Sequence, residues 1–259
     1  MNFDDKTFCL ITGASRGFGR STAVAFAKQC RFHEGSVMIL MGRNEQWLNE
    51  TKRLVNQANC LVSVEIVLCD LENLDTLNEC ISHALGVNCK EFATAILVNN
   101  AGSLGEIKVP VKEQDSLSLA RRYFDLNITS VFHLTSKFVA AFKSSKKFVI
   151  NISSLAAIQE MQFMSFYCSG KAARDMFHKC LACEETEIRV LNYAPGPMET
   201  AMSMNIQQNC GNEASREFFK AMREKNSIIQ PDTSADKLVR ILRKNEYKSG
   251  DHIDFYDFQ

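Results

Sequence analysis

Tyr167 and Lys171 are four positions apart in the segment Tyr167-Cys168-Ser169-Gly170-Lys171, which on a helix places both side chains on one face. A nearby ammonium favours the phenolate and makes the tyrosine a better proton donor or acceptor near neutral pH. Lowering the pKa of a tyrosine from about 10 to about 7 takes roughly 4 kcal/mol, and one unit charge about 4 Å away supplies a similar amount at an effective dielectric constant near 20. The pair therefore predicts acid–base catalysis, although a solvated pair on a helix surface would have the same spacing.

Further polar residues could serve the same reaction. Ser154 follows an apolar, strand-like run thirteen residues before Tyr167 and could hydrogen-bond a substrate carbonyl. The run Asn99–Gly102 follows another apolar run and could brace the edge of a sheet beside a cofactor. Asn127 lies within an apolar helical pattern, where a buried amide needs partners and could hold a water in a proton relay. Together these residues favour catalysis over a solvated tyrosine–lysine pair.

A glycine-rich run, Thr12-Gly13-Ala14-Ser15-Arg16-Gly17-Phe18-Gly19, joins an apolar run to a helical pattern. Its spacing, G-x3-G-x-G, is a variant of the G-x-G-x-x-G dinucleotide fingerprint. Glycines at these positions permit a tight turn and let backbone amides approach a pyrophosphate at the N-terminus of a helix. Three glycines can also make an ordinary turn, but the position directly after the first predicted strand favours dinucleotide binding.

The end of the second predicted strand indicates which dinucleotide is bound. NAD-binding sheets usually place an acidic side chain there to hold the ribose 2′-hydroxyl, but this strand ends in Met41-Gly42-Arg43-Asn44, and the first carboxylate is Glu45. Arg43, helped by Arg16 of the glycine run, could grip a 2′-phosphate that a carboxylate would repel. The sequence therefore predicts NADP(H), and two unrelated surface arginines are the alternative.

Apolar runs that alternate with longer helical patterns supply the scaffold for these residues. We predict strands at Thr7–Thr12, Val37–Met41, Ser63–Cys69, Thr94–Asn99, Lys147–Ile152, Glu187–Tyr193 and His252–Tyr256. We predict helices near Gly19–Cys30, Glu45–Asn59, Leu74–Leu85, Leu117–Lys143, Ser165–Glu184 and Ser234–Lys244. Short apolar strands that alternate with helices indicate βαβ units, and right-handed crossovers leave few topologies. The predicted fold is α/β: a single-domain, doubly wound (Rossmann-type), mostly parallel sheet with helices on both faces, over residues 1–259.

Two features outside the sheet concern a lid and an interface. Residues 195–229 lack a regular pattern and are rich in Met, Asn and Gln, so we interpret residues 197–229 as a lid or binding loop.

The helices at residues 117–143 and 165–184 carry apolar side chains well beyond one stripe. A helix buried on both sides suggests a subunit interface, and we favour a homodimer through these two helices. A tetramer and burial under a long loop are the alternatives.

The composition argues against several other classes of protein. The chain has 259 residues with 30 Lys and Arg against 30 Asp and Glu, and its formal net charge of zero argues against a nucleic-acid surface. The sequence lacks a run near the roughly eighteen apolar residues that a membrane span requires. The opening residues Met1–Lys6 do not resemble a secretory signal. We expect no nucleic-acid partner, no membrane association and a cytoplasmic location.

Ten cysteines are scattered through apolar segments rather than spaced as a disulfide framework. In a cytosolic protein we expect reduced thiols that act as small hydrophobes. Cys180 and Cys183 form a C-x-x-C within a helical pattern, with no second pair and no histidine cluster to complete a zinc site. We expect these two cysteines to pack rather than to bind a metal, and redox chemistry is the alternative.

Taken together, these motifs resemble the short-chain dehydrogenase/reductase family. The matching residues occur in family order over most of the chain: Thr12–Gly19, Asn99–Gly102, Asn127, Ser154, Tyr167, Lys171 and Pro195-Gly196. The resemblance implies hydride transfer from a nicotinamide, with Tyr167 as the general acid and Ser154 polarising the carbonyl. It also implies that Lys171 holds the nicotinamide ribose while tuning the tyrosine, and that Asn127 completes the proton relay.

The resemblance implies a set of cofactor contacts as well. Asp70 would contact the adenine, and Pro195–Ser203 would close over the nicotinamide and the phosphates. The implied cofactor-binding residues are Gly13, Ala14, Ser15, Arg16, Gly17, Phe18, Gly19, Arg43, Asn44, Asp70, Leu71, Asn100, Ala101, Gly102, Lys171, Met198, Glu199, Thr200, Ala201, Met202 and Ser203. No metal is expected.

Further stretches resemble the pterin-reducing members of this family: Gly13–Arg20, Asn151–Leu155, Tyr167–Met176, Val190–Pro197 and Lys248–Asp257. In those enzymes a carboxylate near the C-terminus anchors the pterin, and Asp254 matches it. The 2-amino-pyrimidine edge of a pterin presents adjacent N–H donors that a carboxylate can accept as a pair.

The resemblance thus implies NADPH-dependent reduction of the side-chain keto groups of 6-substituted pterins, the last step of tetrahydrobiopterin synthesis. Residues 248–259 would form the substrate segment. The implied substrate-binding residues are Ser154, Leu155, Tyr167, Gly196 and Asp254.

Two other functions stay open. A broader NADPH carbonyl or steroid reductase on the same fold is favoured if Asp254 faces solvent. A non-catalytic NADP-binding sensor belongs to a different class, but a sensor has no need of a tuned phenol. The complete set of Ser154, Tyr167 and Lys171 therefore favours an enzyme.

Overall fold

A computed structural model describes residues 5–30, 32–86 and 89–257 of the chain. Within them, seven strands form one sheet in the order β3-β2-β1-β4-β5-β6-β7, and all neighbouring pairs are parallel. The strands are β1 (Thr7–Thr12), β2 (Val37–Gly42), β3 (Ser63–Leu68), β4 (Thr94–Asn99), β5 (Lys146–Ile152), β6 (Ile188–Ala194) and β7 (His252–Asp254). The doubly wound α/β fold is confirmed, and each strand lies where an apolar run predicts it.

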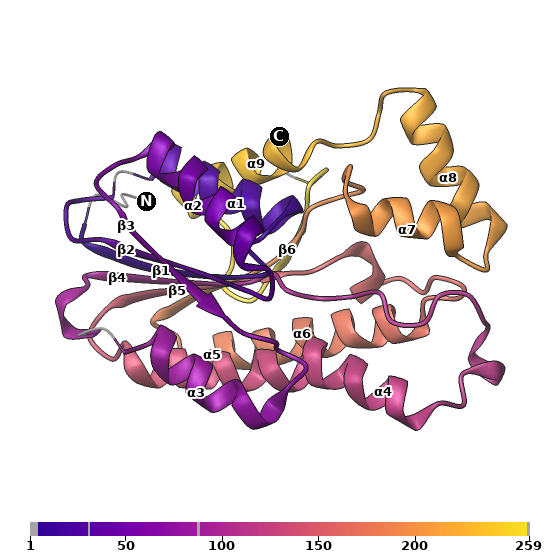
Figure 1. Ribbon diagram of the computed structural model, residues 1–259, viewed down its shortest axis with the longest axis horizontal. Helices are drawn as coiled ribbons and strands as arrows, with labels where there is room; N and C mark the ends of the chain where they lie inside the picture. The colour runs from indigo at the N-terminus through magenta and orange to yellow at the C-terminus, as the bar shows by residue number, and fades with distance from the viewer. Residues whose placement is uncertain (1–4, 31, 87–88, 258–259) are drawn as a thin grey trace.

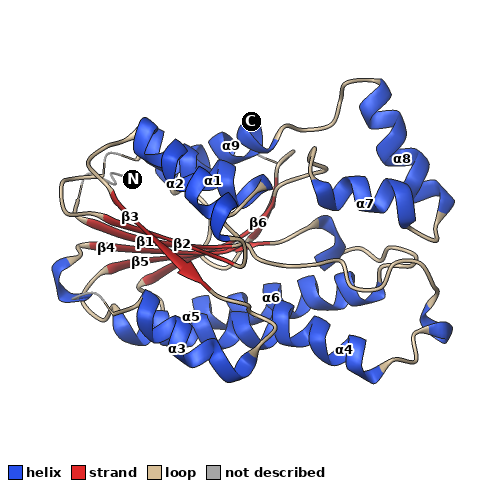
Figure 2. Ribbon diagram, viewed as in Figure 1, coloured by secondary structure: helices blue, strands red, loops and turns tan. Residues whose placement is uncertain are grey.

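Helices cover both faces of the sheet, as Figure 1 and Figure 2 show. One face carries α1 (Gly17–Gln29), α2 (Glu45–Ala58) and α9 (Pro231–Lys244). The other face carries α3 (Leu74–Ala84), α5 (Ser130–Ala141) and α6 (Ser165–Glu184). Three helices extend beyond the sheet to one side: α4 (Leu117–Phe124), α7 (Ala201–Asn209) and α8 (Glu213–Glu224). Short 3-10 turns occupy Cys89–Glu91, Val111–Glu113 and Leu155–Ala157.

The central strands are buried on both faces. In β1, Cys9 and Ile11 belong to the core under α1, α2 and α9. Phe8 and Leu10, which alternate with them, belong to the core on the opposite face with side chains of α3, α5 and α6. Successive side chains of a strand point to opposite faces, so a strand covered on both sides carries consecutive apolar residues in its middle. This two-sided core explains the unbroken apolar runs in the sequence.

The helix predicted near residues 117–143 is present over residues 117–141, but it contains a π turn that was not predicted. The segment forms α4, a π-helical turn at Asp125–Thr129, and then α5. Asn127 lies in the π turn and is buried, and its Nδ2 donates to the carbonyl of Tyr123 at 2.8 Å. A π turn widens the helix locally and is frequent at functional sites. The apolar spacing of the flanking helices continues through the π turn, so hydrophobic periodicity alone predicts one regular helix.

The segment at residues 195–229 is more regular than predicted, because it contains α7 and α8. A capping box begins α7, in which Thr200 Oγ1 accepts from Ser203 N and Ser203 Oγ accepts from Thr200 N. No residue of α8 is fully buried, and its apolar side chains Phe218 and Met222 line a cavity rather than the core. A lid role for this segment stays a prediction, but the segment is helical.

The described cysteines are thiols rather than disulfides, but they are not uniformly buried. Four are buried: Cys9, Cys30, Cys69 and Cys210. Three are exposed: Cys60, Cys180 and Cys183. Cys180 and Cys183 are thus exposed on α6, against the expectation that this pair packs.

The described residues were expected neither to bind a metal nor to span a membrane. No group of three or more His, Cys, Asp or Glu side chains in these residues could hold a metal ion. Among the helices of the same ranges, none is both long and apolar enough to cross a bilayer.

Candidate active site

A cavity of about 1230 Å³ opens at the carboxyl edge of the sheet. It lies where the strand order reverses between β1 and β4, the place at which doubly wound sheets bind ligands. Most of the predicted cofactor-binding residues line it: Gly13, Ser15, Arg16, Gly17, Phe18, Gly19, Arg43, Asn44, Asp70, Leu71, Asn100, Ala101, Gly102, Lys171, Met198, Thr200, Ala201, Met202 and Ser203. Ala14 and Glu199 do not: Ala14, within the glycine run, is fully buried, and Glu199 pairs with Arg223 of α8 at 2.9 Å.

The glycine run is braced by the side chain of Asn100. Asn100 Nδ2 donates to the carbonyls of Thr12 at 2.9 Å and Gly13 at 3.2 Å. Gly13 has a φ of +64°, and a Cβ there would lie 2.9 Å from Asn100 Nδ2. A Cβ at Gly19 would collide with the carbonyl oxygen of Gly13. Both positions therefore require glycine, and the predicted bracing by the Asn99–Gly102 run is confirmed.

The N-terminus of α1 faces the cavity without a compensating group. Arg16 at the N-cap makes no side-chain cap hydrogen bond, and the first turn contains no acidic residue. The first N–H groups of a helix lack intrahelical partners and carry the positive end of the helix dipole. Gly17, Phe18 and Gly19 of this turn line the cavity. The residues present therefore fit the pyrophosphate of a dinucleotide.

Arg16 and Arg43 both line the cavity beside Trp47. The Arg16 guanidinium lies 5.1 Å from the centre of the Trp47 ring. Arg43 Nη1 lies 3.6 Å from Asp70 Oδ1 and 3.8 Å from Glu72 Oε1, with 62% of its side chain exposed. Exposed ion pairs contribute only about 0–1 kcal/mol, so a phosphate can displace them. Two arginines are thus available together for a 2′-phosphate.

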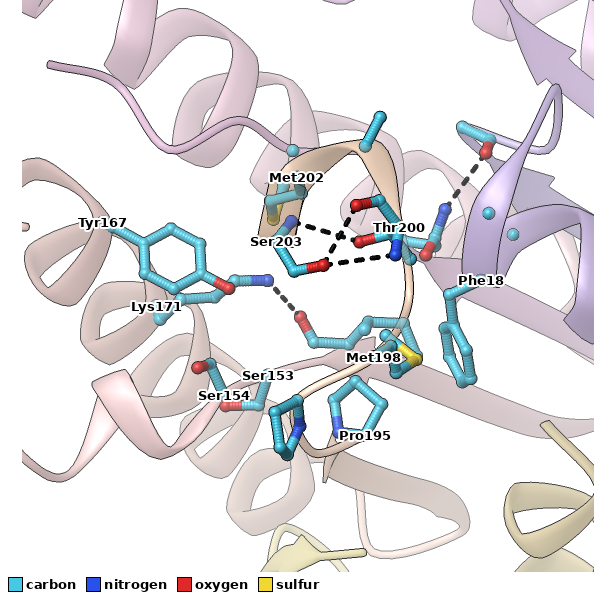
Figure 3. A pocket seen from close by; sticks show the side chains of 18 of the residues that line it. Phe18, Ser153, Ser154, Tyr167, Lys171, Pro195, Met198, Thr200, Met202 and Ser203 are labelled. Carbon is cyan, nitrogen blue, oxygen red and sulfur yellow. Dashed lines mark hydrogen bonds between the residues drawn. The ribbon is translucent and has the colours of Figure 1, made fainter. Parts of the chain in front are cut away.

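Tyr167, Lys171 and Ser154 reach the cavity from two neighbouring elements (Figure 3). Tyr167 and Lys171 lie near the start of α6, and Ser154 follows the end of β5. Lys171 Nζ donates to the carbonyl of Ile152 at 2.5 Å and lies 5.6 Å from the centre of the Tyr167 ring. The loop that carries Met198 lies across the cavity from them. The structure thus brings three of the four predicted catalytic side chains together.

The electrostatics of Tyr167 differ from those of a simple tyrosine–lysine pair. Burial raises the pKa of Tyr167, and a hydrogen bond with Ser154 and the charge of Arg174 only partly lower it again. Burial holds the pKa of Lys171 well below its usual value, and Arg174 acts in the same direction. The prediction that Lys171 brings the tyrosine pKa toward neutrality is therefore wrong, because desolvation outweighs the hydrogen bond with Ser154 and the charge of Arg174.

Arg174 is a site residue that the sequence analysis missed. Arg174 is fully buried. Its Nε donates to Asn151 Oδ1 at 2.8 Å. Nη1 donates to the carbonyl of Ala101 at 2.9 Å, and Nη2 donates to the carbonyl of Asn99. Burial lowers its pKa to about 10. Arg174 thus ties α6 to the ends of β4 and β5. One signal was available, since Arg174 follows Tyr167 by seven positions, which is two helical turns.

The side chain of Asn127 is held by the backbone around it. Its Oδ1 accepts from Ser103 N at 2.9 Å, and its Nδ2 donates to Ser103 Oγ at 3.2 Å and to the carbonyl of Tyr123. The amide therefore fastens the loop after β4 to the π turn. Asn127 does not line the cavity, and its part in a proton relay stays a prediction.

The other half of the cavity is suited to a substrate. The predicted residues Leu155, Gly196 and Asp254 line it. Asp254 Oδ1 accepts from Tyr256 N at 3.0 Å, and Oδ2 accepts no hydrogen bond within the described ranges. Sequence reasoning missed His252, Tyr256 and several apolar lining residues: Ile158, Met161, Met164, Ile206, Phe218, Phe219 and Met222. Most of these apolar residues fall in the segments at 159–166 and 202–229, whose sequence pattern is weak.

We expect Ser154→Ala to lower kcat/KM for carbonyl reduction by about 10²-fold, the effect of removing one donor to a developing oxyanion. The bond with Ser154 lowers the pKa of Tyr167, so its loss raises that pKa. Reduction uses the protonated phenol and is lost as pH rises through its pKa, so the alkaline limb of the pH profile should move to higher pH. Ser165→Ala, outside the cavity, is the control, and a limb that moves to lower pH would contradict the assignment.

Comparison with known proteins assigns the class. The family model described as short chain dehydrogenase matches residues 7–211. The chain belongs to this family and is an oxidoreductase.

Its relatives include enzymes of one named activity. Sepiapterin reductase of Mus musculus is 35% identical over 253 residues, which cover 96% of each chain. Sepiapterin reductase of Xenopus tropicalis is 34% identical over 255 residues, which cover 97% of each chain. Among solved structures, L-sorbose reductase from Gluconobacter frateurii complexed with NADPH and L-sorbose has a TM-score of 0.78 at 23% identity, over 98% of this chain and 95% of that one. That likeness bears on the fold alone.

Proposed function

We propose that this chain is an NADPH-dependent reductase of the side-chain keto groups of 6-substituted pterins, acting in the last step of tetrahydrobiopterin synthesis. The observation that carries the proposal is the Asp254 carboxylate in the same cavity as Ser154, Tyr167 and Lys171. A carboxylate can accept the paired N–H donors of a pterin's 2-amino-pyrimidine edge. Similarity to sepiapterin reductases along nearly the whole chain supports the same substrate class.

The residues of the cavity divide the reaction between them. When bound, the reduced nicotinamide supplies a hydride to the carbonyl carbon. Ser154 donates a hydrogen bond to the carbonyl oxygen, and Tyr167 donates its phenolic proton to the same atom. The raised pKa of Tyr167 keeps the phenol protonated at neutral pH, which suits a proton donor. Lys171 would hold the nicotinamide ribose, and Arg16 and Arg43 would hold the 2′-phosphate.

The test is NADPH oxidation with sepiapterin, compared with simple ketones, steroids and small 1,2-dicarbonyls. We expect kcat/KM to be highest for sepiapterin. Asp254→Ala should raise KM for sepiapterin by about tenfold or more, since a hydrogen bond to a charged group contributes about 1.5–3 kcal/mol, and it should spare the small dicarbonyls. Asp251→Ala, in the same segment but outside the cavity, is the matched control. Equal losses on both substrate types would argue against an anchor, and absent sepiapterin turnover would refute the proposal.

A broader carbonyl reductase is the second candidate, and the apolar lining of the cavity favours it. Met161, Met164, Phe218 and Met222 present apolar surface opposite the polar groups. Such surface binds aromatic or aliphatic groups without hydrogen bonds. The same panel decides between the two, because steroids or bulky ketones reduced as fast as sepiapterin, with no effect of Asp254→Ala, would favour this candidate.

We also propose a homodimer through α4, α5 and α6, and a cytoplasmic location. Leu117 of α4 and Met176 of α6 are 86% and 60% exposed, and Phe132 of α5 stacks on Phe177 of α6 at 3.9 Å. These side chains give the helices an apolar surface that a second copy could cover. The free cysteines fit a reducing compartment.

A further inference from the structure

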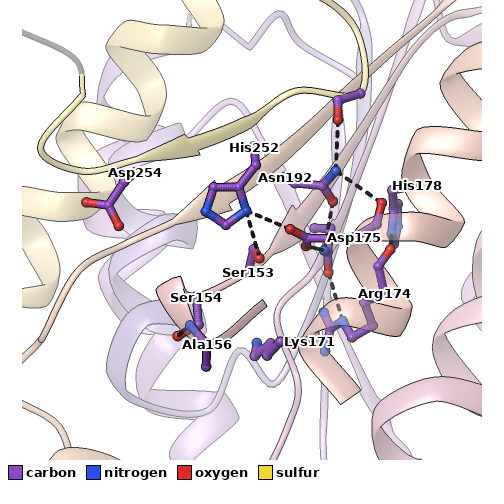
Figure 4. Close-up of polar contacts among 12 residues, drawn as sticks. Ser153, Ser154, Ala156, Lys171, Arg174, Asp175, His178, Asn192, His252 and Asp254 are labelled. Atoms are coloured by element: carbon purple, nitrogen blue, oxygen red, sulfur yellow. Dashed lines mark hydrogen bonds and ion pairs between the residues drawn. The ribbon is translucent and has the colours of Figure 1, made fainter. Parts of the chain in front are cut away.

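A buried histidine–aspartate pair joins the catalytic helix to the strand that carries the proposed substrate anchor (Figure 4). Asp175 lies on α6, one turn after Lys171, and His252 lies on β7, two residues before Asp254. His252 Nδ1 and Asp175 Oδ2 are 2.6 Å apart, and the two side chains are only 9% and 4% exposed. A contact this short between two buried groups fixes the spacing of the elements that carry them.

The Asp175 carboxylate is held from the sheet as well. Its Oδ1 accepts from Asn151 Nδ2 of β5 at 2.9 Å, and the same nitrogen donates to Asn192 Oδ1 of β6 at 2.8 Å. Asn192 Nδ2 in turn donates to the carbonyl of Gly250, just before β7, at 3.1 Å. A carboxylate only accepts, so the hydrogen between the pair lies on His252 Nδ1. The network therefore connects α6 with β5, β6 and β7.

The strand β7 depends on such a connection. It is three residues long, lies at the edge of the sheet and pairs with β6 alone. An edge strand has ladder hydrogen bonds on one side only. After the strand, Lys237 Nζ of α9 donates to the carbonyl of Phe255 at 2.7 Å. Toward α6, β7 is held by the contact of His252 with Asp175.

His252 makes this contact with one ring nitrogen. Ser153 Oγ lies 3.4 Å from the same Nδ1, whereas Nε2 is buried and has no hydrogen-bond partner in the described part of the chain. In Figure 4 the opposite edge of the ring points away from Asp175. A buried polar atom without a partner is unfavourable, so packing alone does not explain a histidine here. The hydrogen bond between Nδ1 and Asp175 does explain it.

We propose that Asp175 and His252 are a positioning pair, which docks β7 onto α6 and thereby holds the Asp254 carboxylate at a fixed distance from Tyr167. The proposal rests on the proposed function, in which Asp254 anchors the substrate. His252 also lines the cavity, but in this proposal it acts through the placement of Asp254 rather than by contact with the substrate. A misplacement of about 1 Å can lower turnover by about 10²-fold, so a loosened β7 should have a measurable effect on substrate binding.

Two amide substitutions separate this role from direct contact with the substrate. The amide nitrogen of asparagine occupies roughly the place of histidine Nδ1, and that of glutamine roughly the place of Nε2. His252→Asn can therefore keep the donor toward Asp175, whereas His252→Gln loses it. We expect His252→Gln to raise KM for sepiapterin by about ten- to a hundredfold. His252→Asn should keep KM for sepiapterin close to the wild-type value, whereas a loss in His252→Asn but not in His252→Gln would indicate contact of Nε2 with the substrate.

A double-mutant cycle with Asp254→Ala tests the route of the effect. If His252 acts through Asp254, His252→Gln should raise KM no further once Asp254 is alanine. Three results would overturn the proposal: fully multiplicative effects on KM, equal impairment by His252→Asn and His252→Gln, or full activity of both variants.

Amide hydrogen exchange gives a readout that needs no substrate. The amides of residues 252–257 should exchange faster in His252→Gln than in wild type or His252→Asn, while those of β1 stay unchanged. Unchanged exchange in His252→Gln would overturn the positioning pair even if sepiapterin is reduced. If wild type does not reduce sepiapterin but exchange rises in His252→Gln alone, the proposed function fails while the docking of β7 by this pair is supported.

Discussion

Replacing Tyr167 with phenylalanine should lower kcat for carbonyl reduction by about 10²–10⁴-fold, the range that a positioned general acid contributes. The phenol is the proposed proton donor, and its raised pKa keeps the proton in place through neutral pH. Phenylalanine keeps the ring that packs against the cluster around Met164 and Ile206, so the cavity and the affinity for NADPH should be retained. Single-turnover NADPH oxidation with sepiapterin measures the loss, and a direct NADPH titration measures the affinity.

A second tyrosine supplies the control for this experiment. The Tyr247 hydroxyl is buried, and the residue lies outside the cavity. Tyr247→Phe therefore removes a phenolic oxygen without touching the proposed chemistry, and it should turn over at the wild-type rate. If Tyr167→Phe were also to turn over near that rate, Tyr167 would not be the acid.

Arg43→Asp should raise the Kd for NADPH by about 10²-fold, with little change in the Kd for NADH. Hydrogen bonds to a charged group contribute about 1.5–3 kcal/mol, which is roughly 10- to 150-fold in affinity, and a carboxylate would also repel the 2′-phosphate. The new side chain could instead accept a hydrogen bond from a ribose 2′-hydroxyl, as acidic residues do in NAD-binding sheets. Titration of both dinucleotides against the variant measures the switch.

Lys146→Asp is the control for the change in charge. Lys146 is exposed and begins β5, at the opposite edge of the sheet from the cavity. Lys146→Asp alters the net charge by the same amount as Arg43→Asp, so it separates direct binding of the phosphate by Arg43 from a general effect of charge. A preference for NADPH over NADH that survives Arg43→Asp would show that another residue recognises the phosphate.

The fold could be predicted wherever burial imposes a regular pattern of apolar residues on the sequence. Every residue of β1 and of β4 is buried, and between their polar ends each strand is a run of four consecutive apolar residues. The π turn at Asp125–Thr129 was not predicted, because the apolar spacing continues on both sides of it. The helix α8 was also missed, since its apolar side chains face the cavity and none of its residues is fully buried.

The site could be predicted where its residues share one local motif, as Tyr167 and Lys171 do. Asp175 and His252 are 77 residues apart, and their contact depends on β6 and β7 being neighbours, which periodicity does not reveal. The predicted direction of the Tyr167 pKa shift was wrong for a related reason. Desolvation is set by the whole surrounding structure, whereas the nearby lysine is visible in the sequence.

The reversal of strand order beside the cavity also has a kinetic consequence. The centre of the sheet joins β1 to β4, so Thr7 pairs with Thr94 across a long stretch of chain. Contacts so distant in sequence form slowly, because the entropy of closing the loop must be overcome before the pairing stabilises it. Until β1 and β4 pair, each of these apolar strands has an open edge, and the partly folded chain can aggregate through it. The arrangement that opens a cleft for the dinucleotide therefore delays the closing of the sheet.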